Sequence, residues 1–205
     1  MVYMLDPIYF NGTIFHLDEE TWEMSGDWMG YERRNQPIPA SCFPQALTFD
    51  EARGVLPDMF HTARDIVMFS ERARLVMERR AAGQVEFIPV DVDAPPKVAA
   101  RLDFADAYYF INVLGRAQRL QWLEMPTRHF PPQGDGIERF GNLPDFSAWK
   151  LRERAAGEPL IWHDEPWMVG DKRYSGQSTV FVEDALWREL DMNFPDQLNA
   201  LRVGG

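Results

Sequence analysis

Residues 65–92, with the sequence DIVMFSERARLVMERRAAGQVEFIPVDV, predict a strand, a helix and a second strand in succession. The first strand is the apolar run at residues 66–69, which is rich in β-formers. Ser70 follows where a helix N-cap belongs, because its hydroxyl can accept a hydrogen bond from a backbone N–H of the first turn. The helix then has apolar residues at three- and four-residue spacing, which predicts one buried face: Ala73, Val76, Met77 and Ala81.

The end of this helix is equally well marked. Arg79 and Arg80 lie where the helix dipole favours cations, and Gly83 is the expected left-handed stop. Residues 85–92 resume as a strand, and Pro89 places that strand at a sheet edge or a bulge because proline has no N–H to donate.

Two later segments extend the pattern. Residues 108–114 are a nearly unbroken apolar run, as expected for a strand covered on both faces. Residues 179–182 lead into residues 183–190 in a second strand-to-helix step. These segments predict an α+β fold with a mixed β-sheet and a few packed helices.

The chain is long enough for one substantial core, so a single domain over residues 1–205 is expected. Because the strand-to-helix step occurs twice, two related lobes, residues 1–93 and 94–205, are the alternative organisation.

Three shorter segments give local predictions. Residues 48–51 resemble the start of a short helix, and residues 148–156 a short helix that ends before Gly157. Residues 160–162 and 167–169 are apolar runs expected to pair across the intervening turn.

The composition restricts the class of partner. Twenty-one basic and thirty-two acidic residues give a net charge of −11. This argues against nucleic acid as a partner, because phosphate contacts need clustered Lys and Arg. The same charge suits a basic protein partner, since complementary fields speed encounter.

The chain is expected to act in the cytoplasm. Its start lacks a basic region followed by an apolar core, so no secretion signal is predicted. No apolar run reaches membrane-spanning length, so no membrane association is expected. With Cys42 as the single cysteine, the chain has no intrachain disulfide.

No catalytic motif, metal-ligand spacing or cofactor-binding loop is recognisable, so no catalytic residue, metal or cofactor is predicted. The one local cluster is His163-Asp164-Glu165. Successive strand residues point to opposite faces, so these three side chains would not converge on one metal ion, and a turn before Pro166 is the preferred interpretation.

Four segments together resemble a family of bacterial immunity proteins that are encoded beside polymorphic toxins. These segments are residues 66–72, 85–90, 108–114 and 179–186. The family, found in Proteobacteria including myxobacteria, was first catalogued as a domain of unknown function. The resemblance implies a protein that binds and neutralises a cognate antibacterial toxin by direct contact, and it implies no catalytic residues.

The expected toxin contacts are two acidic or aromatic groups near the two ends of the chain, because carboxylates can take the place of substrate phosphates on a basic nuclease. They are Asp18, Glu19, Glu20 and Glu23 in the first group, and Asp164, Glu165 and Trp167 in the second.

Two other classes of function stay open. One is a small hydrolase-type enzyme with an acidic site around His163-Asp164-Glu165. The other is a ligand-binding or scaffolding module in which the Pro- and Gly-rich residues 126–146 form a lid or docking segment. The sequence leaves the oligomeric state open as well.

Overall fold

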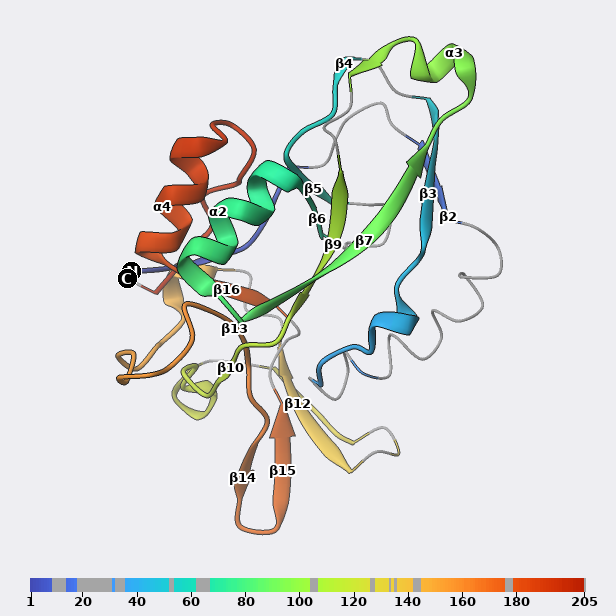
Figure 1. Cartoon of the computed structure of the whole chain (residues 1–205). Helices are drawn as coiled ribbons and strands as arrows, with labels where there is room; N and C mark the ends of the chain where they lie inside the picture. The colour runs from blue at the N-terminus through green and yellow to red at the C-terminus, as the bar shows by residue number, and fades with distance from the viewer. Residues whose placement is uncertain are drawn as a thin grey trace.

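A computed structural model of the chain describes residues 1–8, 14–17, 31, 36–51, 54–61, 67–103, 107–125, 128–132, 134, 136–141, 145–175 and 179–204 (Figure 1). In these ranges the strands form two larger sheets, one smaller sheet and one isolated pair. Parallel and antiparallel neighbours occur together, as in β3–β7 and β7–β9. The predicted α+β class with mixed sheets is confirmed.

The six-stranded sheet has the order β2-β3-β7-β9-β6-β5 in the described part of the chain. In that order its strands are β2 (Ile14–Leu17), β3 (Ala46–Glu51), β7 (Val85–Asp93), β9 (Tyr108–Val113), β6 (Val67–Ser70) and β5 (Met59–His61).

The five-stranded sheet has the order β10-β13-β16-β1-β17 among the described residues. Its strands are β10 (Arg116–Ala117), β13 (Ile161–Asp164), β16 (Val180–Glu183), β1 (Val2–Met4) and β17 (Arg202–Val203).

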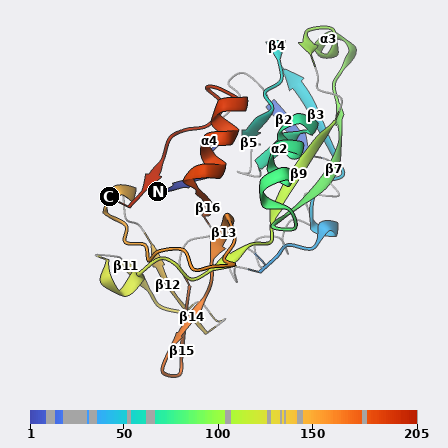
Figure 2. The ribbon, with the colours of Figure 1, turned by 60° about the vertical axis from the view of Figure 1, so that its left-hand side comes forward.

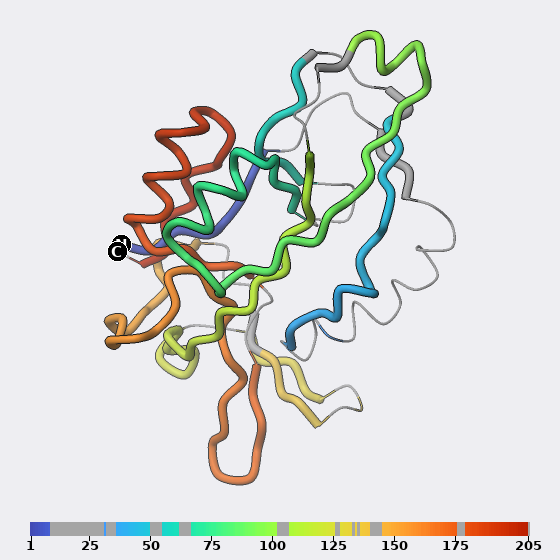
Figure 3. The backbone as a smooth tube through the Cα atoms, in the orientation of Figure 1, coloured from blue at the N-terminus to red at the C-terminus, as the bar shows by residue number. Residues whose placement is uncertain are grey.

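The four-stranded sheet, in the same described ranges, has the order β11-β12-β15-β14, and a separate pair joins β4 to β8. These strands are β11 (Arg128–Phe130), β12 (Ile137–Gly141), β15 (Lys172–Ser175), β14 (Trp167–Val169), β4 (Gly54–Val55) and β8 (Leu102–Asp103). The β14–β15 hairpin projects away from the helices (Figure 3).

The described helices are α2 (Glu71–Ala81), α3 (Pro96–Ala99) and α4 (Asp184–Asn193), with three 3-10 turns, η1 (Ala40–Cys42), η2 (Trp122–Glu124) and η3 (Phe146–Ala148). No helix in the described ranges is long and apolar enough to cross a membrane.

The strand–helix–strand unit predicted at residues 65–92 is present as β6, α2 and β7. Ser70 Oγ accepts a hydrogen bond from the Ala73 N–H at 3.2 Å and so caps α2. Gly83 has a φ of +73° just after the helix, as predicted for its stop. The predicted edge position of β7 is wrong, because β7 lies between β3 and β9. Pro89 pairs with Tyr109 of β9, and β3 pairs with β7 only further along, from Asp91 to Asp93.

Alternate residues of the central strands belong to different cores. On β6, Val67 and Phe69 pack with α2, whereas Met68 belongs to a core on the other side of the sheet. The predicted coverage of residues 108–114 on both faces is confirmed for β9, whose Phe110 and Ile111 belong to these two opposite cores.

Helices α2 and α4 lie side by side in both ribbon views and contact one another (Figures 1 and 2). Arg79 and Arg80 of α2 pair with Glu189 of α4. The core beneath them includes Phe69 of the six-stranded sheet and Val182 of the five-stranded sheet. The two predicted strand-to-helix steps, β6–α2 and β16–α4, therefore share one core, and the division into lobes at residue 93 stays a prediction.

Three local predictions are wrong. Residues 48–51 belong to strand β3, in which Leu47 and Phe49 are both fully buried, so tertiary packing overrides the helix-start signal. Residues 148–156 form no helix beyond the 3-10 turn η3, because Leu151 instead bridges to Leu120.

The third wrong prediction concerns β13 and β14, which do not pair with one another. Strand β13 pairs with β10 and β16, and β14 pairs with β15 in another sheet. The Glu165 N–H donates to the Ala117 carbonyl at 3.0 Å, so the chain continues alongside β10 before it leaves the sheet.

Candidate functional site

The His163-Asp164-Glu165 cluster spans the end of β13 and the start of the link to β14. Because side chains alternate along the strand, the three residues have different environments: Asp164 is fully buried, His163 is half-buried and Glu165 is exposed. The preferred turn interpretation is wrong here: His163 and Asp164 belong to strand β13, and Glu165 and Pro166 form a two-residue link that contains no turn.

The Asp164 carboxylate holds the segment that follows β10. It accepts hydrogen bonds from the Arg119 N–H at 3.1 Å, the Leu120 N–H at 3.3 Å and the Trp122 Nε1–H at 2.6 Å. Since β10 runs parallel to β13 with Ala117 opposite Asp164, the chain leaving β10 passes directly over this side chain. Burial raises the pKa of Asp164 to about 7, although the three hydrogen bonds act in the opposite direction.

Residues 118–122 are also fixed from their other side, by the backbone of residues 150–152. The Gln121 N–H donates to the Lys150 carbonyl and the Arg152 N–H to the Arg119 carbonyl, both at 3.0 Å. The segment is therefore held between the backbone of residues 150–152 and the buried Asp164 carboxylate, which makes it a rigid support for the surface that it presents.

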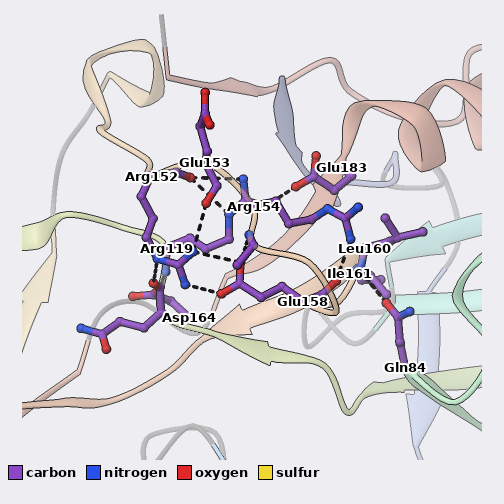
Figure 4. Close-up of polar contacts among 12 residues, drawn as sticks. Gln84, Arg119, Arg152, Glu153, Arg154, Glu158, Leu160, Ile161, Asp164 and Glu183 are labelled. Carbon is purple, nitrogen blue, oxygen red and sulfur yellow. Dashed lines mark hydrogen bonds and ion pairs between the residues drawn. The ribbon is translucent and has the colours of Figure 1, made fainter.

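Two arginines form ion pairs here: Arg119 lies within this segment, and Arg152 lies in the segment that flanks it (Figure 4). Arg119 is buried, pairs with Glu183, and its guanidinium lies 4.5 Å from the centre of the Trp162 ring. Arg152 pairs with Glu158, and this hydrogen bond is the main reason why the pKa of Glu158 falls to about 2.

A pocket of about 490 Å³ opens between η2 and the β14–β15 hairpin. Trp122 and Trp167 line it, with parallel rings whose centres are 6.5 Å apart. Three apolar side chains of the lining are exposed: Leu123 by 63%, Met168 by 60% and Val169 by 44%. We call Leu123, Met168 and Val169 the apolar rim.

The predicted contact residues near the C-terminus thus lie at this pocket in different roles. Trp167 is mostly buried and forms part of the pocket wall. Asp164 lies behind the wall and holds Trp122 in place. Glu165 is exposed on the link between β13 and β14. The other predicted contacts, Asp18, Glu19, Glu20 and Glu23, lie outside the described residues.

The apolar rim, including Leu123, was not predicted from the sequence. Leu123 stands in residues 120–125, LQWLEM, where four apolar residues are mixed with Gln121 and Glu124 and nothing in the sequence marks which apolar side chain is exposed. Trp122 and Leu123 both belong to the 3-10 turn η2, whose geometry buries Trp122 and leaves Leu123 exposed. Among the described residues, no group of three or more His, Cys, Asp or Glu side chains is arranged to hold a metal ion.

No protein-family model matches this chain, and no curated protein matches its sequence. The role of the pocket and its rim is therefore inferred from the chemistry of their own residues.

Proposed function

We propose that this chain is an immunity protein that binds a cognate antibacterial toxin and neutralises it by direct contact. The observation that carries the proposal is the apolar rim beside a pocket with two parallel tryptophan rings. The resemblance of four sequence segments to the immunity-protein family and the net charge of −11 support it.

The rim has the features of an exposed apolar patch at a protein-binding surface. Exposed apolar side chains that cluster around a concavity are a common mark of a partner surface, since each contributes most when a partner excludes water from it. The pocket volume of about 490 Å³ is large enough to accept an aromatic or long aliphatic side chain of the partner.

The backbone around the rim is suited to the same task. Among the described strands, β14 lies at the edge of its sheet, and the β14–β15 hairpin projects from the body of the molecule (Figure 1). In an antiparallel ladder every second residue of an edge strand turns its N–H and C=O outward. A projecting hairpin of this kind can enter a toxin cleft while the rim packs against the wall of that cleft.

The hydrolase alternative around His163, Asp164 and Glu165 has one feature in its favour, the raised pKa of Asp164. However, the Asp164 side chain is fully buried, and three protein N–H groups occupy its oxygens. This favours a structural role for Asp164.

The test is co-expression with the toxin-like protein encoded beside this chain, with survival and co-purification both scored. Wild-type protein should restore growth and co-purify with the toxin. The double variant Leu123→Asp, Met168→Asp should lose both, because a carboxylate on each side of the pocket cannot be buried against a partner without a large desolvation penalty. The matched control is Val55→Asp, Met192→Asp, which changes two side chains exposed by 71% and 75% outside this pocket.

Three results would decide against the proposal. Rescue by the wild type without a complex would contradict neutralisation by binding. An intact complex with the rim variant would exclude the rim as the contact surface. Equal loss in the rim variant and the control would show that added charge alone, not the rim, weakens the complex.

A further inference from the structure

A second pocket, of about 580 Å³, lies next to the first and shares Arg119, Gln121 and Arg152 with it. Its wall comes from four parts of the chain: Met1 with the start of β1, Arg119 with Gln121, residues 147–153, and β17 with Gly204. Trp149, Leu151 and Val203 are among its apolar lining residues.

The charge of this pocket is opposite to that of the chain. Its ionisable side chains are four cations and one carboxylate: Arg119, Lys150, Arg152, Arg202 and Glu153. The whole chain carries 32 acidic and 21 basic residues. The Glu153 carboxylate points away from Arg119 and Arg152 (Figure 4). Cations are therefore concentrated here although acidic residues predominate elsewhere.

Two of the cations are held in fixed positions by carboxylates that are not part of the pocket lining. Arg119 pairs with Glu183, and its Nε and Nη2 donate to the Arg152 carbonyl. Arg152 pairs with Glu158, and its Nε donates to the Gln118 carbonyl at 2.8 Å. These contacts orient the guanidinium groups before any ligand arrives, which reduces the entropy lost on binding.

The other two cations, Lys150 and Arg202, have no buried carboxylate beside them in the described part of the chain. The Lys150 side chain is 55% exposed, and its ammonium lies 3.7 Å from Glu124, which is equally exposed. Arg202 is exposed and makes no ion pair with any residue in the described part of the chain. An anion entering the pocket would meet these two groups without first displacing a buried carboxylate.

We propose that this pocket binds a small molecule that carries an oxyanion, either a phosphate or a carboxylate group. Lys150 and Arg202 contact the oxyanion directly, as cationic donors to its oxygens. Arg119 and Arg152, each paired with a carboxylate, form the side shared with the first pocket, and the wall of Trp149, Leu151 and Val203 accommodates the uncharged part of the ligand.

The experiment is isothermal titration of the full chain with two probes, inorganic phosphate and citrate, at constant ionic strength. The double variant Lys150→Glu, Arg202→Glu removes the two direct contacts. The matched control is Lys97→Glu, Arg101→Glu, which makes the same change of charge at exposed sites on and just after α3, away from β1 and β17 (Figure 1).

We expect saturable binding of at least one probe by the wild type and by the control, and binding weaker by at least about tenfold in the Lys150/Arg202 variant. Binding of phosphate alone assigns the site to phosphoryl ligands, and binding of citrate alone assigns it to carboxylates. No saturable binding of either probe would overturn the proposal, and so would equal weakening in the two variants, which would indicate a general effect of charge. Since Lys150 and Arg202 do not line the first pocket, loss of anion binding is separable from loss of the toxin partner.

Discussion

The buried carboxyl group of Asp164 joins strand β13 to two adjacent backbone N–H groups and to one tryptophan side chain. Its two oxygens accept three hydrogen bonds from residues 119, 120 and 122, which all precede the exposed Leu123. Three N–H donors that would otherwise be buried without partners are satisfied by one side chain. The position of the apolar rim on this side of the pocket therefore depends on a residue that solvent does not reach.

Asp164 should make the fold less stable as pH rises. Its pKa is raised from 3.8 to about 7, so between these values the folded chain holds more protons than the unfolded chain. Ionisation then destabilises the fold, by at most about 1.4 kcal/mol per pH unit. Asp164→Asn has no group that ionises at this position, so this pH dependence is absent from the variant. The variant should also be less stable, because its amide N–H groups face the N–H donors that the carboxyl oxygens accept from. We expect the wild type to exceed the variant in free energy of unfolding at about pH 5, and the difference to narrow toward about pH 8.

Urea unfolding of both proteins across this range measures the effect. Glu158→Gln is the contrasting control, because the pKa of Glu158 is lowered from 4.5 to about 2 and its contribution is lost only as pH falls through that interval. A stability difference between the wild type and Asp164→Asn that does not change with pH would contradict the raised pKa.

At the scale of elements, Gly115 is the point where the chain passes from one large sheet to the other. It follows β9 of the six-stranded sheet and precedes β10 of the five-stranded sheet. Its carbonyl accepts a hydrogen bond from the His163 N–H at 3.0 Å. A Cβ at this position would lie 2.0 Å from the Ile161 carbonyl oxygen, so the close approach of the two strands requires glycine.

Gly115→Ala should therefore destabilise the protein by about 3 kcal/mol, because backbone atoms must move to relieve the overlap. Gly83→Ala is the matched control: Gly83 has a φ of +73°, but a Cβ added there would meet no atom within 4 Å, so only backbone strain of about 1 kcal/mol is expected. Chemical denaturation of the two variants checks the order. Equal losses would mean that β10 and β13 can separate without penalty.

At the scale of the whole molecule, the acidic net charge is not mirrored at the two pockets, one of which is basic in its lining and the other apolar at its rim. The net charge of −11 belongs to the chain as a whole, whereas the second pocket gathers four cations and the apolar rim is uncharged. Long-range attraction to a basic partner and the close contacts that hold it can therefore come from different residues.

Under the proposed function, this separation predicts how the rate constants of toxin binding depend on salt and on the rim. With a basic toxin, the association rate constant should fall as salt concentration rises, because salt screens the attraction between opposite net charges. The rim variant Leu123→Asp, Met168→Asp should chiefly raise the dissociation rate constant, since the rim makes short-range contacts. Surface plasmon resonance at several salt concentrations measures both constants. An association rate constant insensitive to salt would contradict the role of net charge.

Much of the fold follows from local patterns. Residues 65–92 carry a cap, a periodic apolar face and a stop, and each lies where the structure has it. The apolar run at residues 108–114 predicted the central strand β9 in the same way. Patterns of this kind are decided by near neighbours in sequence, so they can be recognised without the tertiary structure.

The strand pairing and the candidate site depend on the tertiary structure. Residues 167–169 have the apolar pattern of a strand, but their partner is β15 and not β13, since burial of Asp164 and the ladder to Ala117 direct the chain elsewhere. The exposure of Leu123 and Met168 and the gathering of Arg119, Lys150 and Arg202 arise from contacts between distant segments. Through local propensity and periodicity, the sequence by itself determined the β6–α2–β7 unit, strand β9 and the β16–α4 step, but it did not determine strand β3, which it marked as the start of a helix. Only the tertiary structure decided the two pockets, because contacts between distant segments determine which apolar and charged side chains are buried and which stay exposed.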